Sequence, residues 1–161
     1  MSNAPRSKYA SEIVRTMGAK YVQGRDVAEI AKCIRADIAA AVKAGEIPAV
    51  KVSVRVSRYS MGQSVNVTIS AVPAGFPVLN PARVRADIER PHDYNPIPRL
   101  SALASFVVDE VEAIALAYQR AETDTMADYR NANFALSVDF SGDVESADRA
   151  RVAAAPASRA A

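Results

Sequence analysis

Residues 49–72, which read AVKVSVRVSRYSMGQSVNVTISAV, contain two runs in which apolar and polar side chains alternate. Successive side chains of a β-strand point to opposite faces, so a period of two collects the apolar side chains on one face. The pattern predicts two strands joined by a short loop at residues 57–64, with one face that needs a hydrophobic core beneath it. The aliphatic positions are Val50, Val52, Val54, Val56, Val65, Val67, Ile69 and Ala71.

The opposite face of this hairpin is polar and is the first candidate binding surface. Its cations suit phosphate groups, and its tyrosine offers a ring on which an unstacked base can lie. The same residue types suit a protein partner, and they equally describe an ordinary solvated face. The candidate binding residues are Lys51, Ser53, Arg55, Arg58, Tyr59, Asn66 and Thr68.

A helix is predicted directly before the hairpin. Asp26 is a suitable N-cap, and Glu29 three residues later completes an acidic form of the capping box. Gly45 suits the left-handed residue that ends a helix, and Pro48 prevents the helix from resuming. Between these ends, one apolar stripe is expected to pack on the hairpin. It consists of Val27, Ile30, Ala31, Ile34, Ile38, Ala41 and Val42.

Two short helices are predicted from weaker signals. Tyr9, Ile13 and Met17 have helical spacing, which predicts a first helix over residues 7–17. Asn80 followed by Pro81 is typical of a helix start, and this helix must end before the next proline at position 91.

The second half of the chain predicts a long helix and a third strand. Periodicity favours a helix over residues 100–121, with Leu100, Leu103, Phe106, Val107, Val111, Ile114 and Tyr118 facing inward. Alternation in residues 133–140 predicts a half-buried strand. A final helix is expected to continue to about residue 152.

A length of 161 residues suits one domain. We assign it to residues 1–145, with a proline-rich insertion at about residues 73–99. The Ala- and Arg-rich tail at residues 146–161 is expected to be partly disordered. One cysteine excludes an internal disulfide framework, and the start lacks the apolar stretch of a signal peptide, so we expect a cytoplasmic protein.

Charge is distributed unevenly along the chain. Residues 1–104 contain 15 Lys and Arg against 8 Asp and Glu, whereas residues 105–148 contain 2 against 10. Such asymmetry indicates either separate positive and negative surfaces or two halves that pair with each other in the fold. On the first interpretation, an acidic interaction surface is expected at Asp109, Glu110 and Glu112.

Catalytic and metal sites are not indicated by the residue types present. His92 is the only histidine, and no serine or cysteine is placed to complete a nucleophilic triad with it and Asp93. Cys33 lies beside the apolar stripe of its helix, which favours an inert thiol. Zinc needs several Cys or His ligands, and the acidic residues match no calcium loop. We therefore expect no enzyme activity, metal or cofactor.

Residues 26–70 and 124–140 together resemble one of the large polyvalent protein-associated domains of phage and plasmid proteins. The resemblance is carried by the helix VAEIAKCIRADIAAAVKAG, the strands VKVSVRVSRYS and SVNVTIS, the turn at Met61 and Gly62, and TMADYRNANFALSVDF with its Asp128–Tyr129 pair. The resemblance implies a phage or plasmid setting for the protein. Such domains are accessory modules of mobile elements without a settled enzymatic role.

Together these observations predict an α+β fold of two layers, in which amphipathic helices pack on one face of a three-stranded, mainly antiparallel sheet. We expect a non-enzymatic accessory protein of a phage or plasmid that inhibits a host defence complex, of the anti-CRISPR or anti-restriction type, by protein–protein binding. The alternative is a nucleic-acid-binding module that uses the polar face of residues 49–72. A homodimer formed through that face or through an edge strand would give the same pattern.

Overall fold

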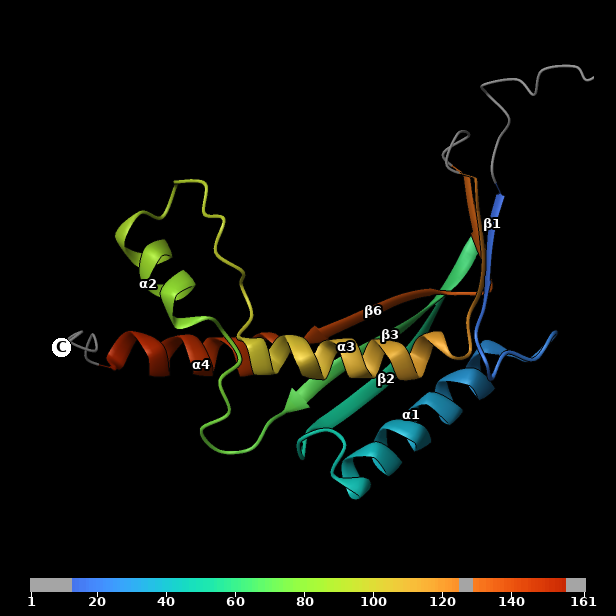
Figure 1. Cartoon of the computed structure of the whole chain (residues 1–161), viewed down its shortest axis with the longest axis horizontal. Coiled ribbons are helices and arrows are strands. Elements are labelled where there is room, and N and C mark those ends of the chain that lie inside the picture. The colour runs from blue at the N-terminus through green and yellow to red at the C-terminus, as the bar shows by residue number, and fades with distance from the viewer. Residues whose placement is uncertain (1–12, 125–128, 156–161) are drawn as a thin grey trace, which may run out of the picture.

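The alternating residues form the predicted hairpin from β2 (Lys51–Tyr59) and β3 (Gly62–Ala71). In the computed structural model of the chain, which describes residues 13–124 and 129–155, the two strands pair antiparallel with Val54 opposite Val67 (Figure 1). The third predicted strand, β6 (Ala135–Phe140), pairs with β3 in the parallel direction, so the order is β2-β3-β6. Both outer strands of this main sheet are therefore edges.

Helix α1 (Val27–Ala44) begins and ends as its sequence predicts. The side chain of Asp26 accepts the backbone N–H of Ala28 at 2.8 Å, and Gly45 follows in the left-handed conformation with a φ of 75°. Positive φ is cheap only for residues such as glycine, so this position defines where the helix stops. The predicted stripe faces the sheet: Val27, Ile30, Ala31, Ile34, Ile38 and Ala41 are all buried.

The second layer consists of α1 and α3 (Ala102–Leu116), which lie on one face of the main sheet (Figure 1). Helix α1 packs mainly on β2, whereas α3 packs on β6 and also touches α1. The predicted α+β class and the packing of helices on one face are confirmed. Three of the four strand pairings in the described residues are antiparallel, and only β3 with β6 is parallel.

The inward side of α3 differs from the prediction. Its buried residues are Ala104, Val107, Val111 and Ala115, whereas the predicted core residues Leu103 and Phe106 are exposed. The small alanine side chains let the helix approach its neighbours closely, and this turns the larger side chains outward. The helix also ends at Leu116, before the predicted residue 121, because the chain becomes a strand at Arg120.

A second sheet was not predicted. It consists of β1 (Ile13–Met17), β4 (Arg120–Asp124) and β5 (Tyr129–Ala132), all antiparallel, with β4 in the middle. In Figure 1 it stands at one end of the main sheet. The predicted helix over residues 7–17 is wrong for its second half, which forms β1, and its first half lies outside the described residues. Helical spacing alone did not reveal that β4 offers this segment a strand partner.

The proline-rich segment contributes to the core. The helix predicted after Asn80 is α2 (Pro81–Glu89), and the Asn80 side chain accepts the N–H of Ala82 at 3.0 Å. Phe76, Val78, Leu79 and Val84 from the same segment are buried in the main core.

The last helix, α4 (Gly142–Ala154), packs near α2 and the end of β3. Val152 joins the hydrophobic core, so the chain is integrated into the fold up to this helix. The rest of the tail, residues 156–161, for which disorder was expected, lies outside the described residues. Among the helices of the described part, none has the length and apolar character needed to cross a membrane.

Candidate binding surfaces

The outer face of the main sheet is the one whose side chains point away from α1 and α3. Strand β6 extends this face, with Ser137 beside Asn66 and Asp139 beside Thr68. The described part of the second half therefore widens the polar face. Lys51 and Arg55 are exposed on it, whereas Ser53, Asn66 and Thr68 are half-buried. By strand alternation, six of the seven candidate residues lie here: Lys51, Ser53, Arg55, Tyr59, Asn66 and Thr68.

Asn66 is the centre of a hydrogen-bond network on this polar face. Its amide nitrogen donates to the hydroxyl oxygens of Ser64 at 3.1 Å and Ser57 at 3.4 Å. Its amide oxygen accepts from the hydroxyl of Ser137 at 3.0 Å. These bonds join the three strands, so the role that the geometry supports for Asn66 is to hold the surface together.

Arg58, the seventh candidate residue, lies on the other side of the sheet. Its guanidinium donates to the carboxylate of Asp26 at 2.8 Å, next to the start of α1. Strand alternation explains this position: Arg58 is four residues after the buried Val54, so both side chains point to the same face of β2. The basic part of the outer face therefore consists of Lys51 and Arg55 without Arg58.

The acidic surface predicted on α3 has an apolar component. Asp109 is exposed, and Glu110 and Glu112 are half-buried. On the same helix Leu103, Phe106 and Leu116 have exposed fractions of 41%, 43% and 42%. Apolar residues occupy most of the circumference of this helix, so periodicity could not indicate which of them face solvent.

Some of the charge asymmetry is neutralised inside the fold. Arg15 on β1 pairs with Glu122 on β4 at 3.1 Å, and Arg99 pairs with Glu145 on α4. These ion pairs join the basic first part of the chain to the acidic second part. Asp109, Glu110 and Glu112 of α3 form no ion pair with another described residue, so they remain the candidate acidic surface.

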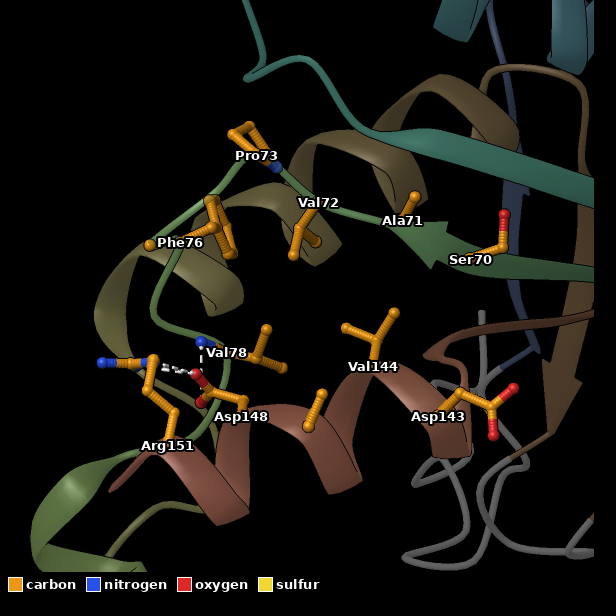
Figure 2. A pocket seen from close by; sticks show the side chains of 12 residues that line it. Ser70, Ala71, Val72, Pro73, Phe76, Val78, Asp143, Val144, Asp148 and Arg151 are labelled. Carbon is orange, nitrogen blue, oxygen red and sulfur yellow. Dashed lines mark hydrogen bonds and ion pairs between the residues drawn. The ribbon is translucent and has the colours of Figure 1, made fainter. Parts of the chain in front are cut away.

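A shallow pocket of about 380 Å³ lies between α4 and the segment that follows β3 (Figure 2). Its walls are mainly apolar and include Phe76, Val78 and Val144. The buried carboxylate of Asp148 accepts the backbone N–H groups of Val78 and Leu79 at 3.1 and 2.8 Å. Its other oxygen accepts two bonds from the guanidinium of Arg151. Asp148 is fully engaged in joining α4 to this segment, which indicates a structural role for the carboxylate.

A second polar cluster joins α1 to the end of α3. The carboxylate of Asp37 accepts Lys20 Nζ at 2.5 Å and the hydroxyl of Tyr118 at 2.6 Å. The Lys20 bond, followed by the Tyr118 bond, lowers the pKa of Asp37, whereas burial and then the Asp37 bond raise the pKa of Tyr118. The two bonds to Asp37 tie α1 to the segment before it and to the end of α3, so the geometry supports a structural role for this cluster.

Family models, curated proteins and solved structures contain no match to this chain. The resemblance of residues 26–70 and 124–140 to mobile-element domains thus stays a prediction.

The candidate reactive residues are dispersed. His92 is exposed in the loop after α2, and Cys33 is a half-buried free thiol on α1. Within residues 13–124 and 129–155, no three His, Cys, Asp or Glu side chains are arranged to hold a metal ion. Asp128, whose pair with Tyr129 belongs to the resemblance, lies outside the described residues.

Proposed function

We propose that this chain is a non-enzymatic binding protein that docks onto another protein through the outer face of α3. The observation that carries the proposal is the exposure of Leu103, Phe106 and Leu116 along this one helix. Large apolar side chains gathered on one exposed face are typical of interaction sites, because their burial by a partner is favourable. We call these three residues, with Asp109 and Glu110, the α3 patch.

The charge of the α3 patch favours a basic partner. Asp109 and Glu110 lie one turn after Phe106 and between it and Leu116 along the helix. A partner surface with apolar pockets and a rim of Lys or Arg would complement both properties. The same carboxylates would repel the phosphates of a nucleic acid.

The class of partner rests on the family resemblance. Mobile elements act in host cells, where a defence complex that handles nucleic acid must have a basic channel. An apolar patch flanked by carboxylates is suited to cover such a channel. Inhibition of a host defence complex, of the anti-CRISPR or anti-restriction type, is therefore the biological role that we propose.

An affinity capture from host lysate tests this proposal. The wild-type chain is expected to retain a nuclease or surveillance complex, and a Leu103→Ser/Phe106→Ser variant is expected to lose it. Both positions are more than 40% exposed, so the variant should keep the wild-type circular dichroism and melting temperature. Ile88→Ser on α2 is the matched control, because Ile88 is exposed outside the patch. Equal capture by the double variant would contradict the proposal.

Direct nucleic-acid binding is the second candidate, and a hollow at the turn end of the polar face favours it. The hollow has a volume of about 190 Å³ and is lined by Tyr59 and Met61 together with Arg130 of β5. An aromatic ring beside a guanidinium suits a stacked base and its phosphate. Arg130 was not among the residues indicated by the sequence, because it reaches this position only through the second sheet.

A mobility shift with single-stranded and double-stranded DNA and RNA at two salt concentrations tests this second candidate. A salt-dependent complex that is lost in Lys51→Ala/Arg55→Ala and kept in Arg58→Ala would support it, because Arg58 lies on the other side of the sheet. The absence of a shift at low salt would exclude it.

A further inference from the structure

A groove of about 400 Å³ runs between α1 and the edge strand β2. Its floor is apolar and is formed by Ile38 and Val42 of α1 with Val50 and Val52. Figure 1 shows α1 alongside β2 at this edge of the main sheet. The groove lies apart from the α3 patch and shares only Lys51 with the polar outer face.

The backbone of β2 is available to a partner at this edge. The carbonyl of Val54 accepts a hydrogen bond from Arg35 Nη2 at 2.7 Å, so it points away from β3. In an antiparallel pair the backbone groups of alternate residues point to the same edge. The N–H and C=O groups of Val52 and Val56 must therefore also point outward, where an added strand could pair with them.

The rim of the groove is basic. Arg35 and Lys51 line it, and no acidic residue does. Lys32 precedes Arg35 by three positions, and Lys43 follows Ala39, another lining residue, by four, so both lie on the same side of α1. Both lysines are exposed, and β2 adds Arg55 to the same edge.

We propose that this groove binds an extended acidic segment of another protein, which adds a strand to β2. Its main chain would pair with the outward groups of Val52 and Val56, and alternate apolar side chains would enter the groove over Val42. The side chains between them would point to the opposite face of the sheet, where their carboxylates would lie beside Lys51 and Arg55. A carboxylate and the guanidinium of Arg55 form a strong, charge-assisted bond.

A second copy of the chain is a poorer occupant of the groove. Pairing of β2 with β2 of another copy would bring together two strands that carry Lys51, Arg55 and Arg58 and no acidic residue. Like charges at close range in a sheet are unfavourable. A strand with acidic side chains is therefore a better partner for the basic strand β2 than a second copy of β2.

The test uses a blocked, labelled peptide, acetyl-Glu-Val-Glu-Val-Glu-Val-amide, added to the ¹⁵N-labelled full chain at pH 7. We expect the amide signals of Val52 and Val56 to shift and their hydrogen exchange to slow, because these N–H groups gain partners. The basic peptide acetyl-Lys-Val-Lys-Val-Lys-Val-amide is the matched control and should leave these signals unchanged.

Variants identify the cation that meets the carboxylates of the peptide. We expect Arg55→Ala to weaken binding of the acidic peptide about tenfold, since it removes a charge-assisted bond. Arg55 is exposed, so this variant should keep the wild-type melting temperature. Arg35→Ala leaves the outer face unchanged and should weaken binding less, and a larger loss for Arg35→Ala than for Arg55→Ala would overturn the proposal.

Other occupants give distinguishable results. Slow exchange at Val52 and Val56 in the absence of peptide, with a sedimentation mass of two chains, would assign the groove to a second copy. Equal shifts with a twelve-nucleotide oligothymidine would assign the basic rim to nucleic acid. Either result, or no shift with the acidic peptide, would overturn the proposal.

Discussion

The carboxylate of Asp148 accepts the backbone N–H of Leu79 at 2.8 Å, although 69 residues separate the two in the sequence. The same oxygen accepts the N–H of Val78 (Figure 2). One buried side chain therefore holds two consecutive backbone donors. Because Val78 and Leu79 are themselves buried, the bond ties the proline-rich segment to α4 inside the core. This connection integrates two segments that the sequence suggests are peripheral.

We expect the substitution Asp148→Ala to destabilise the fold. The substitution leaves two buried N–H groups without an acceptor and Arg151 without its partner, so we expect the free energy of unfolding to fall by about 3 kcal/mol. Urea denaturation followed by circular dichroism measures the change. Arg149→Ala, an exposed position on the same helix, is the control and should have little effect. A similar small effect for Asp148→Ala would contradict the structural role.

The pH dependence of stability is expected to report on Asp37. Its pKa is lowered from 3.8, chiefly by the bond from Lys20 and then by the bond from Tyr118. A carboxyl group with a lowered pKa stabilises the fold fully above its unfolded value, and this contribution is lost as the pH falls through the folded value. We therefore expect stability to fall below a pH of about 4, and Asp37→Asn to reduce this fall.

A control is needed because the pKa of Asp87 is lowered as well, so Asp87 also contributes to the pH dependence of stability. The bond from Arg83 is the largest cause that lowers the pKa of Asp87. The comparison is therefore made in an Asp87→Asn background, by thermal melts between pH 3 and pH 6, a window of roughly the usual carboxyl range. Tyr118→Phe should give a partial effect, since it removes the smaller of the two bonds to Asp37. Unchanged pH dependence in Asp37→Asn would contradict the assignment.

Gly18→Ala is expected to loosen the junction between β1 and α3. A Cβ at position 18 would lie 2.2 Å from the carbonyl oxygen of Ala117 and 2.4 Å from that of Leu116. These are backbone atoms that cannot move aside easily, so we expect a loss of about 2 kcal/mol or more in stability. Gly142→Ala meets nothing within 4 Å and should be tolerated. Melting temperatures of both variants provide the measurement, and equal values would be evidence against the close approach.

Asp26 and Arg58 are expected to differ in their effects on stability. Asp26→Ala removes the N-cap of α1 and should cost about 1 kcal/mol. Arg58→Ala removes only an exposed ion pair, with side chains 61% and 55% exposed, and should cost less than about 1 kcal/mol. Chemical denaturation of the single and double variants measures both effects and their coupling. A larger loss for Arg58→Ala would show that Arg58 has a role beyond this pair.

The sequence by itself determined β2, β3 and α1 and the apolar stripe that packs them together. Each has a strong local signal: a period of two in the strands, a period of 3.6 in the helix, Asp26 before it and Gly45 after it. The start of α2 at Asn80 and Pro81 is equally local. Periodicity and capping depend on neighbours a few residues away, so they can be recognised without knowledge of the fold.

Only the tertiary structure decided the second sheet, the outward face of α3 and the partner of Arg58. Strand β1 exists because it pairs with β4 more than 100 residues later, with Arg15 opposite Glu122. Helix α3 is apolar nearly all round, so more than one of its sides could have faced the core. The side with Ala104 and Ala115 packs inward, and Phe106 on another side is therefore exposed. These features arise from contacts between segments distant in sequence, and a local pattern contains no information about which distant segment will be its neighbour.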